Sequence, residues 1–190
     1  ALRKFASFMV ETGYHHRDIG TGIRSPRVPR KEPAFLNQHE YKALLFEAQR
    51  RNRPRDYAIL MTFLQTGVRE GELVRLAVAD IDLDRREMTV TDRKGGVDTS
   101  ITLSTPAMEV LLKSLSLRPH VDTDRLFVSK TGRPLTERLI RYLVRYYMTK
   151  AGIWKQASAH TLRHTFGAFK SAKNVDLKTL QYWMGHRRPE

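Results

Sequence analysis

The sequence contains no cysteine and no long run of apolar residues. Without cysteine the chain can form no disulfide, no thiolate zinc site and no cysteine nucleophile. No apolar stretch approaches the roughly 18 residues that a membrane-spanning helix needs, and no signal-peptide core follows the first residue. We therefore expect a cytoplasmic protein that has no membrane partner.

Acidic residues are scarce relative to basic ones. The chain has 20 Asp and Glu against 34 Lys and Arg, which gives a formal net charge of +14 and a pI near 10.4. Such a charge favours a polyanionic partner, nucleic acid before membrane. The 190 residues, 41% of them hydrophobic, are enough for one domain with a core and a piece of a second.

The first 35 residues differ in pattern from the rest. Residues 1–14 are amphipathic, with Leu2, Phe5 and Phe8 at helical spacing, and predict the last helix of a preceding domain. Residues 15–35 combine glycines and prolines with basic side chains, which predicts an interdomain linker. This linker is either simply solvated or follows a phosphate backbone. Its candidate DNA-binding residues are Arg24, Arg27, Arg30 and Lys31.

Residues 36–190 mix helical and strand patterns and predict a mainly α fold with a small antiparallel β-sheet, an α+β class. Asn37 and Glu40 form a capping-box signal, and Gly67 should end a helix that is apolar on nearly every side. Alternating segments flank a glycine-rich turn at residues 93–96 and predict a hairpin. The expected helices are 38–48, 55–65, 105–115, 136–151, 160–173 and 176–183, and the expected strands are 87–91, 99–103 and, as a short third strand, 126–128.

Two basic residues of this region could carry chemistry. Arg69 lies at the predicted start of a helix, where the dipole is already positive, so a nearby anion is expected. That anion could be the carboxylate of Glu72, three residues on, or a ligand, and Glu72 could also orient the guanidinium toward a ligand. Lys94 lies at the hairpin tip beside Arg93, either as a solvated turn residue or as a side chain that reaches DNA and donates a proton.

A histidine cluster near the end of the sequence has three interpretations. His160, Arg163 and His164 share one helical face, and His186 follows Gly185. The histidines could bind a metal, although Thr161 stands where a metalloprotease helix has its glutamate. They could instead satisfy carbonyls in the core. In the third interpretation, Arg163 binds phosphate oxygens while a histidine donates a hydrogen bond or moves a proton.

Taken together, these segments resemble the tyrosine recombinase (phage integrase) family. Residues 66–73 (TGVREGEL) resemble its first arginine motif, residues 160–166 (HTLRHTF) its H-x-x-R box, and residues 180–186 (LQYWMGH) the helix and histidine that follow. Lys94 matches the hairpin lysine in order and context, although Val97, Asp98 and Thr99 replace the basic residues that often follow it. The resemblance covers residues 36–190, while residues 1–14 resemble the end of the core-binding domain.

The resemblance implies the DNA breaking-rejoining fold, a double-stranded DNA substrate and a 3′-phosphotyrosyl intermediate. Arg69 and Arg163 would bind the scissile phosphate, Lys94 would protonate the leaving 5′ oxygen, His160 would move a proton and His186 would donate to a non-bridging oxygen. Glu72 and His164 would support them, and Arg93 would contact DNA. No metal or other cofactor is expected. The whole protein would act as a nucleoid-associated tetramer, whereas this chain alone could be monomeric.

The resemblance also implies a tyrosine nucleophile roughly ten residues after His186, and the chain reaches only Glu190. We therefore expect that the catalytic domain lacks its tyrosine segment and that the chain alone is inactive; a tyrosine supplied in trans by a neighbour is the alternative. Two other functions stay open, a catalytically silent DNA-binding module and a metal-dependent nuclease.

Overall fold

The computed structural model describes residues 2–24, 33–91, 98–155 and 157–185. The chain forms two compact units, Ala1–Glu32 and Pro33–Glu190. Among the described residues no helix combines the length and the apolar character that a membrane crossing requires.

The first unit is built on helix α1 (Leu2–Glu11), followed by a segment that folds back on it. Asp18 accepts hydrogen bonds from the hydroxyl of Ser7 (3.2 Å) and from the backbone N–H of Gly20 (2.7 Å). Gly20 lies so close to α1 that a Cβ there would be 2.8 Å from the Cβ of Ala6. Arg24, at the end of this segment, is exposed.

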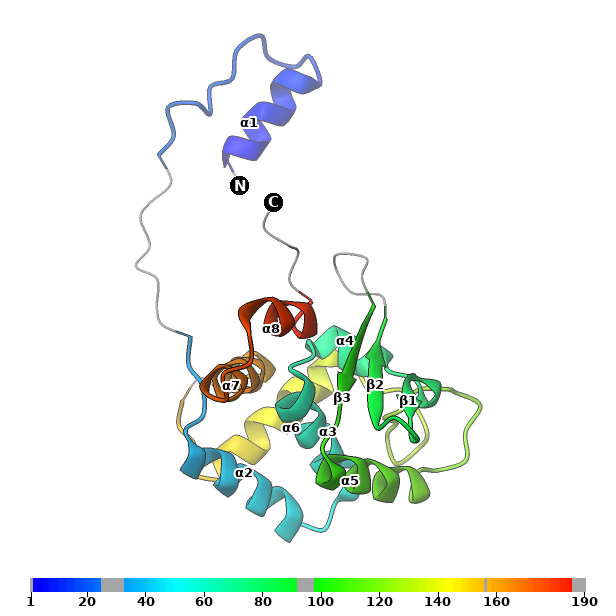
Figure 1. The fold of residues 1–190 in the computed structure, drawn as a ribbon. Helices are drawn as coiled ribbons and strands as arrows, with labels where there is room; N and C mark the ends of the chain where they lie inside the picture. The colour runs from blue at the N-terminus through cyan, green and yellow to red at the C-terminus, as the bar shows by residue number, and fades with distance from the viewer. Residues whose placement is uncertain (1, 25–32, 92–97, 156, 186–190) are drawn as a thin grey trace. The chain divides into compact units, whose positions relative to one another are not determined.

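The second unit is mainly helical, as the sequence predicts (Figure 1). The capping box at the first helix is present: Asn37 accepts from the N–H of Glu40 (2.9 Å), and Glu40 accepts from the N–H of Asn37 (2.8 Å). The following helix ends at Gly67, as expected. The helices are α2 (Gln38–Arg50), α3 (Pro54–Thr66), α4 (Glu70–Arg75), α5 (Thr105–Ser116), α6 (Glu137–Lys150), α7 (Ala159–Ala172) and α8 (Leu177–Trp183), with a 3-10 turn at Val78–Asp80.

A three-stranded antiparallel sheet completes the unit, in the order β1 (Ile81–Asp82), β2 (Glu87–Val90), β3 (Thr99–Thr102). The predicted hairpin is confirmed, with Met88 opposite Ile101. The prediction of a third strand at residues 126–128 is wrong, because this segment makes only an isolated bridge at Val128 and its apolar side chains are buried in the core. The third strand is β1, whose two residues are strand only because they pair with β2.

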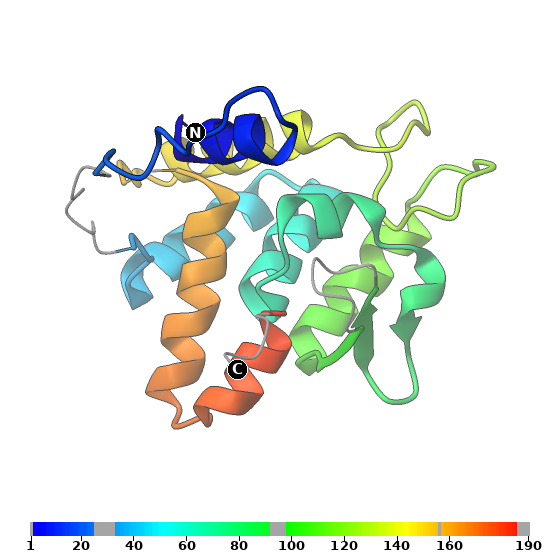
Figure 2. The ribbon, with the colours of Figure 1, turned by 90° about the horizontal axis from the view of Figure 1, so that it is seen from above.

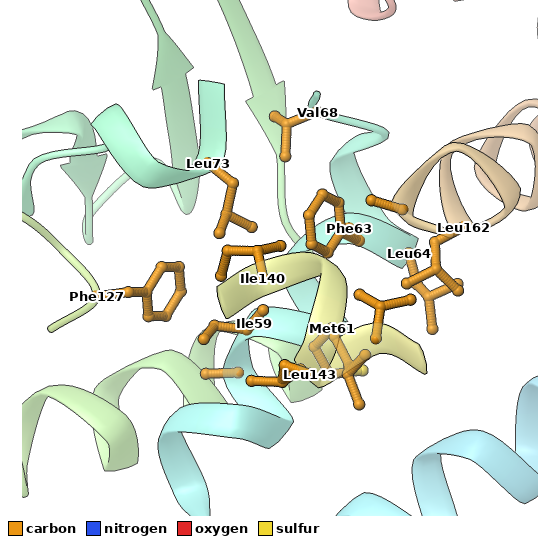
Figure 3. Packing of buried hydrophobic residues seen from close by; sticks show 14 of the residues in the cluster. Ile59, Met61, Phe63, Leu64, Val68, Leu73, Phe127, Ile140, Leu143 and Leu162 are labelled. Carbon is orange, nitrogen blue, oxygen red and sulfur yellow. The ribbon is translucent and has the colours of Figure 1, made fainter. Parts of the chain in front are cut away.

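The core surrounds α3, which contacts α2, α5 and α7. Most α3 side chains are buried, and Figure 3 shows Phe63 and Leu64 of α3 beside Ile140 of α6 and Leu162 of α7. The expectation of a central apolar helix is confirmed. The two ends of α3 therefore have fixed positions, and the C-terminal end leads directly into Arg69.

Helix α7 is tied to the start of the second unit. The backbone N–H of Leu36 donates to the hydroxyl of Thr165 (2.9 Å), and both residues are fully buried. Lys155, before α7, donates to the carboxylate of Glu40 (2.7 Å) and to the carbonyl of Phe35 (3.2 Å). These bonds fix α7 against α2 by polar contacts in addition to apolar packing.

Gly67 sets the closest approach of α3 to α7. It ends α3 in the left-handed conformation (φ 61°), and its N–H donates to the carbonyl of Phe63 (2.9 Å). A Cβ at this position would lie 2.5 Å from Cδ1 of Phe166, one turn after Arg163 on α7. Glycine is therefore required both by the backbone conformation and by the neighbouring ring.

We expect Gly67→Ala to lower the free energy of unfolding by about 2–5 kcal/mol, because a left-handed backbone cost of about 1–2 kcal/mol adds to an overpacking cost of about 1–3 kcal/mol. Gly152→Ala is the matched control, since Gly152 has a similar φ (72°) but no atom within 4 Å of the added Cβ. It should show only the backbone cost. Urea unfolding measures both, and equal losses in the two variants would mean that Phe166 moves aside without cost.

Candidate active site

Arg163 joins three segments that are distant in the sequence. Its side chain lies on α7, is only 4% exposed, and donates from Nη1 to the carbonyl of Gly67 and from Nη2 to the carbonyl of Met184. Gly67 ends α3, and Met184 follows α8. Because these acceptors are uncharged, the two bonds fix the guanidinium plane without cancelling its positive charge.

Arg69 lies at the start of α4 and reaches the same segment as Arg163. Its Nη1 donates to Oε1 of Glu72 (2.6 Å), and its backbone N–H donates to Oε2 of Glu72 (2.8 Å). Its Nη2 lies 3.4 Å from the carbonyl oxygen of Gly185. The Arg69 side chain is 34% exposed, whereas that of Glu72 is 3% exposed. The ion pair that the sequence spacing allows is therefore present, and it orients the guanidinium while leaving part of it open to solvent.

The loop after α8 is the meeting point of the two arginines. Met184 accepts from Arg163, and the next residue, Gly185, accepts from Arg69. Figures 1 and 2 show α7 and α8 joined by a short turn and lying side by side. The position of α8 therefore determines where both guanidinium groups are held.

Aromatic and polar contacts hold α8 in place. The Trp183 ring lies 6.4 Å from that of Phe166, and the ammonium of Lys170 lies over both rings, 5.0 Å from the Trp183 centroid and 5.6 Å from the Phe166 centroid. On the other side, the hydroxyl of Thr99 donates to the carbonyl of Tyr182 (3.4 Å). Helix α8 is thus fixed between α7 and strand β3, an arrangement that no sequence motif indicates.

His160 and His164 lie one turn apart on α7, with ring centroids 5.1 Å apart and ring planes nearly perpendicular. His160 is exposed and His164 is half-buried. Burial lowers the pKa of His164, and the charges of His160 and Arg163 lower it further. Near neutral pH, His164 is therefore uncharged, while the exposed ring of His160 is accessible to a ligand.

The remaining predicted site residues divide into two groups. Arg24 is exposed in the first unit, and Glu72 lies in the site. Among the described residues, no three His, Asp or Glu side chains gather as a metal site would require. Outside the described residues lie Arg27, Arg30, Lys31, Arg93, Lys94 and His186.

A basic face on α6 escaped the motif search. Arg138, Arg141 and Arg145 recur every three or four residues and are exposed, as is Tyr142 between them. Arg141 also lies 3.5 Å from the carboxylate of Glu70, the neighbour of Arg69, so this face adjoins the start of α4. The spacing of the arginines was the signal that could have identified it. We call these four residues the α6 basic face.

Comparisons with known proteins agree on one family. A model of the phage integrase family matches residues 34–190. The chain is 34% identical over 169 residues to the tyrosine recombinase XerC of Caldanaerobacter subterraneus subsp. tengcongensis, a match that covers 86% of this chain and 47% of the relative. It is 30% identical over 167 residues to the tyrosine recombinase XerA of Pyrococcus furiosus, with 86% of this chain and 57% of the relative covered. The chain thus spans about half the length of these curated relatives.

Solved structures show the same likeness. A crystal structure of XerA recombinase superposes with a TM-score of 0.77 at 28% identity and covers 96% of this chain and 72% of that one. A XerH site-specific recombinase, bound to its palindromic difH substrate in a post-cleavage complex, gives a TM-score of 0.71 at 27% identity over 82% of this chain and 47% of that one. The expected fold class is confirmed by these neighbours.

The lowered pKa of His164 predicts a pH-dependent stability. The unfolded histidine binds a proton near pH 6.5, whereas the folded one binds it only at lower pH, so the unfolded state takes up more protons as the pH falls below about 7. The free energy of unfolding should therefore decrease from pH 7 toward pH 5. His164→Asn should flatten this slope in urea titrations at several pH values, and an unchanged slope would show that another group is responsible.

Proposed function

Because the chain belongs to the phage integrase family of tyrosine recombinases, we propose that the protein is a site-specific DNA recombinase. It cleaves a DNA strand by attack of a tyrosine on a phosphodiester, which forms a 3′-phosphotyrosyl bond and frees a 5′ hydroxyl. That hydroxyl is the nucleophile that rejoins the strands, and the covalent bond conserves the energy of the broken one. This chain supplies the residues that bind and activate the phosphate.

The convergence of Arg69 and Arg163 on consecutive carbonyls carries this proposal. The guanidinium groups belong to segments 94 positions apart in the sequence, and both donate to the loop formed by Met184 and Gly185. Two positive charges in fixed orientation suit the negative charge that develops on the non-bridging oxygens of a phosphodiester under attack. The buried Glu72 holds Arg69 ready for this contact.

His160 is the candidate for proton transfer. It is exposed, three residues before Arg163 on the same helix, so both side chains project from one face of α7. The half-buried His164 packs edge-on against its ring and restricts its orientation. An exposed imidazole in this position can reach a bound phosphodiester and serve as a proton donor or acceptor.

Lys94 and His186 are proposed to complete the site. Lys94 belongs to the connection between β2 and β3, and β3 contacts α8. Its ammonium would protonate the leaving 5′ oxygen. His186 follows Gly185, the acceptor of Arg69, and would donate to a non-bridging oxygen. With this set of cations, we propose that cleavage requires no metal and no other cofactor.

We further propose that the attacking tyrosine is none of the seven in this chain. A nucleophile is favoured by a lowered pKa, but burial raises the pKa of Tyr41, Tyr57 and Tyr147. Tyr182 lies in the last turn of α8, and its hydroxyl donates to the carbonyl of Asp98 (3.5 Å). The nucleophile would then come from a further segment of the same protein or from a neighbouring subunit.

Double-stranded DNA is the proposed partner, held in the cytoplasmic nucleoid by a tetramer of the whole protein. The α6 basic face presents cations and an exposed tyrosine along one helix next to α4, an arrangement that suits a DNA groove and its phosphates. The linker residues Arg24, Arg27, Arg30 and Lys31, and Arg93 on the hairpin, would add phosphate contacts.

A nicked suicide substrate tests the proposed reaction. The full-length protein should form a covalent adduct with the DNA, because loss of the short cleaved fragment prevents rejoining. The adduct should be visible on denaturing gels and should form equally in EDTA. Binding without an adduct would indicate a silent DNA-binding module, and loss of cleavage in EDTA would indicate a metal-dependent nuclease.

Arg163→Lys in the same assay tests the role of the clamp. Lysine keeps the charge but cannot donate to Gly67, Met184 and a phosphate in one plane, so cleavage should fall by about 100-fold or more. Affinity for the uncleaved duplex should change little. An equal loss of binding and cleavage would make Arg163 a binding residue rather than a catalytic one.

The double variant Arg138→Ala/Arg145→Ala tests the α6 basic face. Each lost phosphate contact should reduce the slope of log affinity against log salt by about 0.9, so the slope should fall by about 2 and affinity should fall for all sequences. Arg85→Ala/Lys113→Ala removes the same charge from exposed positions on other elements and should leave the slope nearly unchanged. Fluorescence anisotropy measures the DNA affinity of both double variants at several salt concentrations. Equal changes of slope in the two would mean that the α6 basic face acts only through general electrostatic attraction.

A further inference from the structure

A cavity lies at the opposite end of α3 from Arg69. It has a volume of about 370 Å³, and residues 52–56 at the start of α3 form one wall. The C-terminal end of α5 and the segment before α6 form the others. Because α3 has 13 residues and each adds 1.5 Å, about 20 Å separates this cavity from the arginine site. The cavity is therefore distinct from the proposed catalytic centre.

The lining of the cavity is strongly basic. Four cations line it, against one carboxylate, that of Asp56. Asp56 is 3% exposed and already accepts from Arg55 (2.7 Å) and from the hydroxyl of Tyr147 (3.1 Å). Its charge is thus compensated within the protein, chiefly by Arg55, and the four cations together leave the lining with an excess of positive charge. These cations are Arg53, Arg55, Arg118 and Lys130.

The start of α3 adds partial positive charge to the same wall. The N-cap residue, Arg53, makes no side-chain hydrogen bond to the helix, and Pro54 occupies the first turn. In the described structure no side chain therefore caps the first N–H groups of α3, which point along the dipole toward the cavity end. Helix starts of this kind bind anions, phosphate above all.

The side chain of Ser114 is a second, independent observation that points to a ligand in this cavity. It lies on α5, lines the cavity and is only 8% exposed. Within the ranges that the structure describes, its hydroxyl has no hydrogen-bond partner, although a helical serine commonly bonds the carbonyl four residues earlier. A buried hydroxyl left without a partner is unfavourable, and an acceptor oxygen of a ligand would give it one.

We propose that this cavity binds a small organic phosphate of about the size of a mononucleotide. The phosphate would lie at the start of α3, between the cations and the Ser114 hydroxyl. The apolar part of the lining, formed by Leu117, Leu126 and Val128, would contact the base or another ring. A cavity of this volume is within the range of small-molecule sites. The site is independent of DNA cleavage.

Isothermal titration calorimetry with AMP, adenosine and inorganic phosphate tests the proposal on the 190-residue chain. AMP should bind with a Kd below about 1 mM, while adenosine and inorganic phosphate should each bind at least about tenfold more weakly. If adenosine bound as tightly as AMP, the proposal that the cavity recognises a phosphate would be overturned. If inorganic phosphate bound as tightly as AMP, the ligand would be the free anion, and the proposal of an organic phosphate would be overturned.

Two variants and one competition locate the binding. Arg53→Ala/Lys130→Ala should weaken AMP at least about tenfold through loss of charge-assisted contacts, and Ser114→Ala about threefold or more through loss of one hydrogen bond. Arg85→Ala/Lys150→Ala, which removes two exposed cations elsewhere, should leave AMP binding unchanged. Thermal unfolding by circular dichroism checks that all variants fold. Unchanged AMP affinity in both cavity variants, or displacement of AMP by duplex DNA, would refute the site.

Discussion

The buried guanidinium of Arg163 is the interaction on which the arrangement of the site depends. By donating to Gly67 and Met184, it connects the end of α3 with the loop after α8. A charge that is 96% removed from solvent must be surrounded by acceptors, so the fold cannot shift either carbonyl without a large cost. The left-handed Gly67, packed against Phe166, makes this close approach possible.

The second arginine depends on the same loop but is held differently. Arg69 remains partly exposed and is oriented by a buried carboxylate, that of Glu72, as well as by Gly185. One guanidinium is therefore rigid and enclosed, and the other is accessible. For a proposed phosphate site this division is useful, because the buried cation has a fixed orientation and the exposed one is open to solvent and to a ligand. Trp183 and Thr99, which hold α8, stabilise both.

Helix α3 connects the two basic regions of the second unit. Its C-terminal end leads to Arg69, and its uncapped start borders the cavity that contains Ser114. Its apolar surroundings keep both ends in place, as the packing around Phe63 shows (Figure 3). The basic residues that give the chain its net charge of +14 thus gather in separate places. One set of cations lies with the phage integrase motifs, and another lies about 20 Å away along the helix.

Local signals in the sequence determined the helices, the hairpin and the chemical character of the site, because caps, glycines and helical spacing act within a few residues. The capping box at Asn37 and the end of α3 at Gly67 are examples. The third strand was misplaced, since a two-residue strand exists only through its partner. Tertiary structure alone decided that the guanidinium groups of Arg69 and Arg163 share the loop at Met184, and that Ser114 borders a cavity. Bonds between residues as much as 129 positions apart depend on how helices pack, which no local pattern encodes.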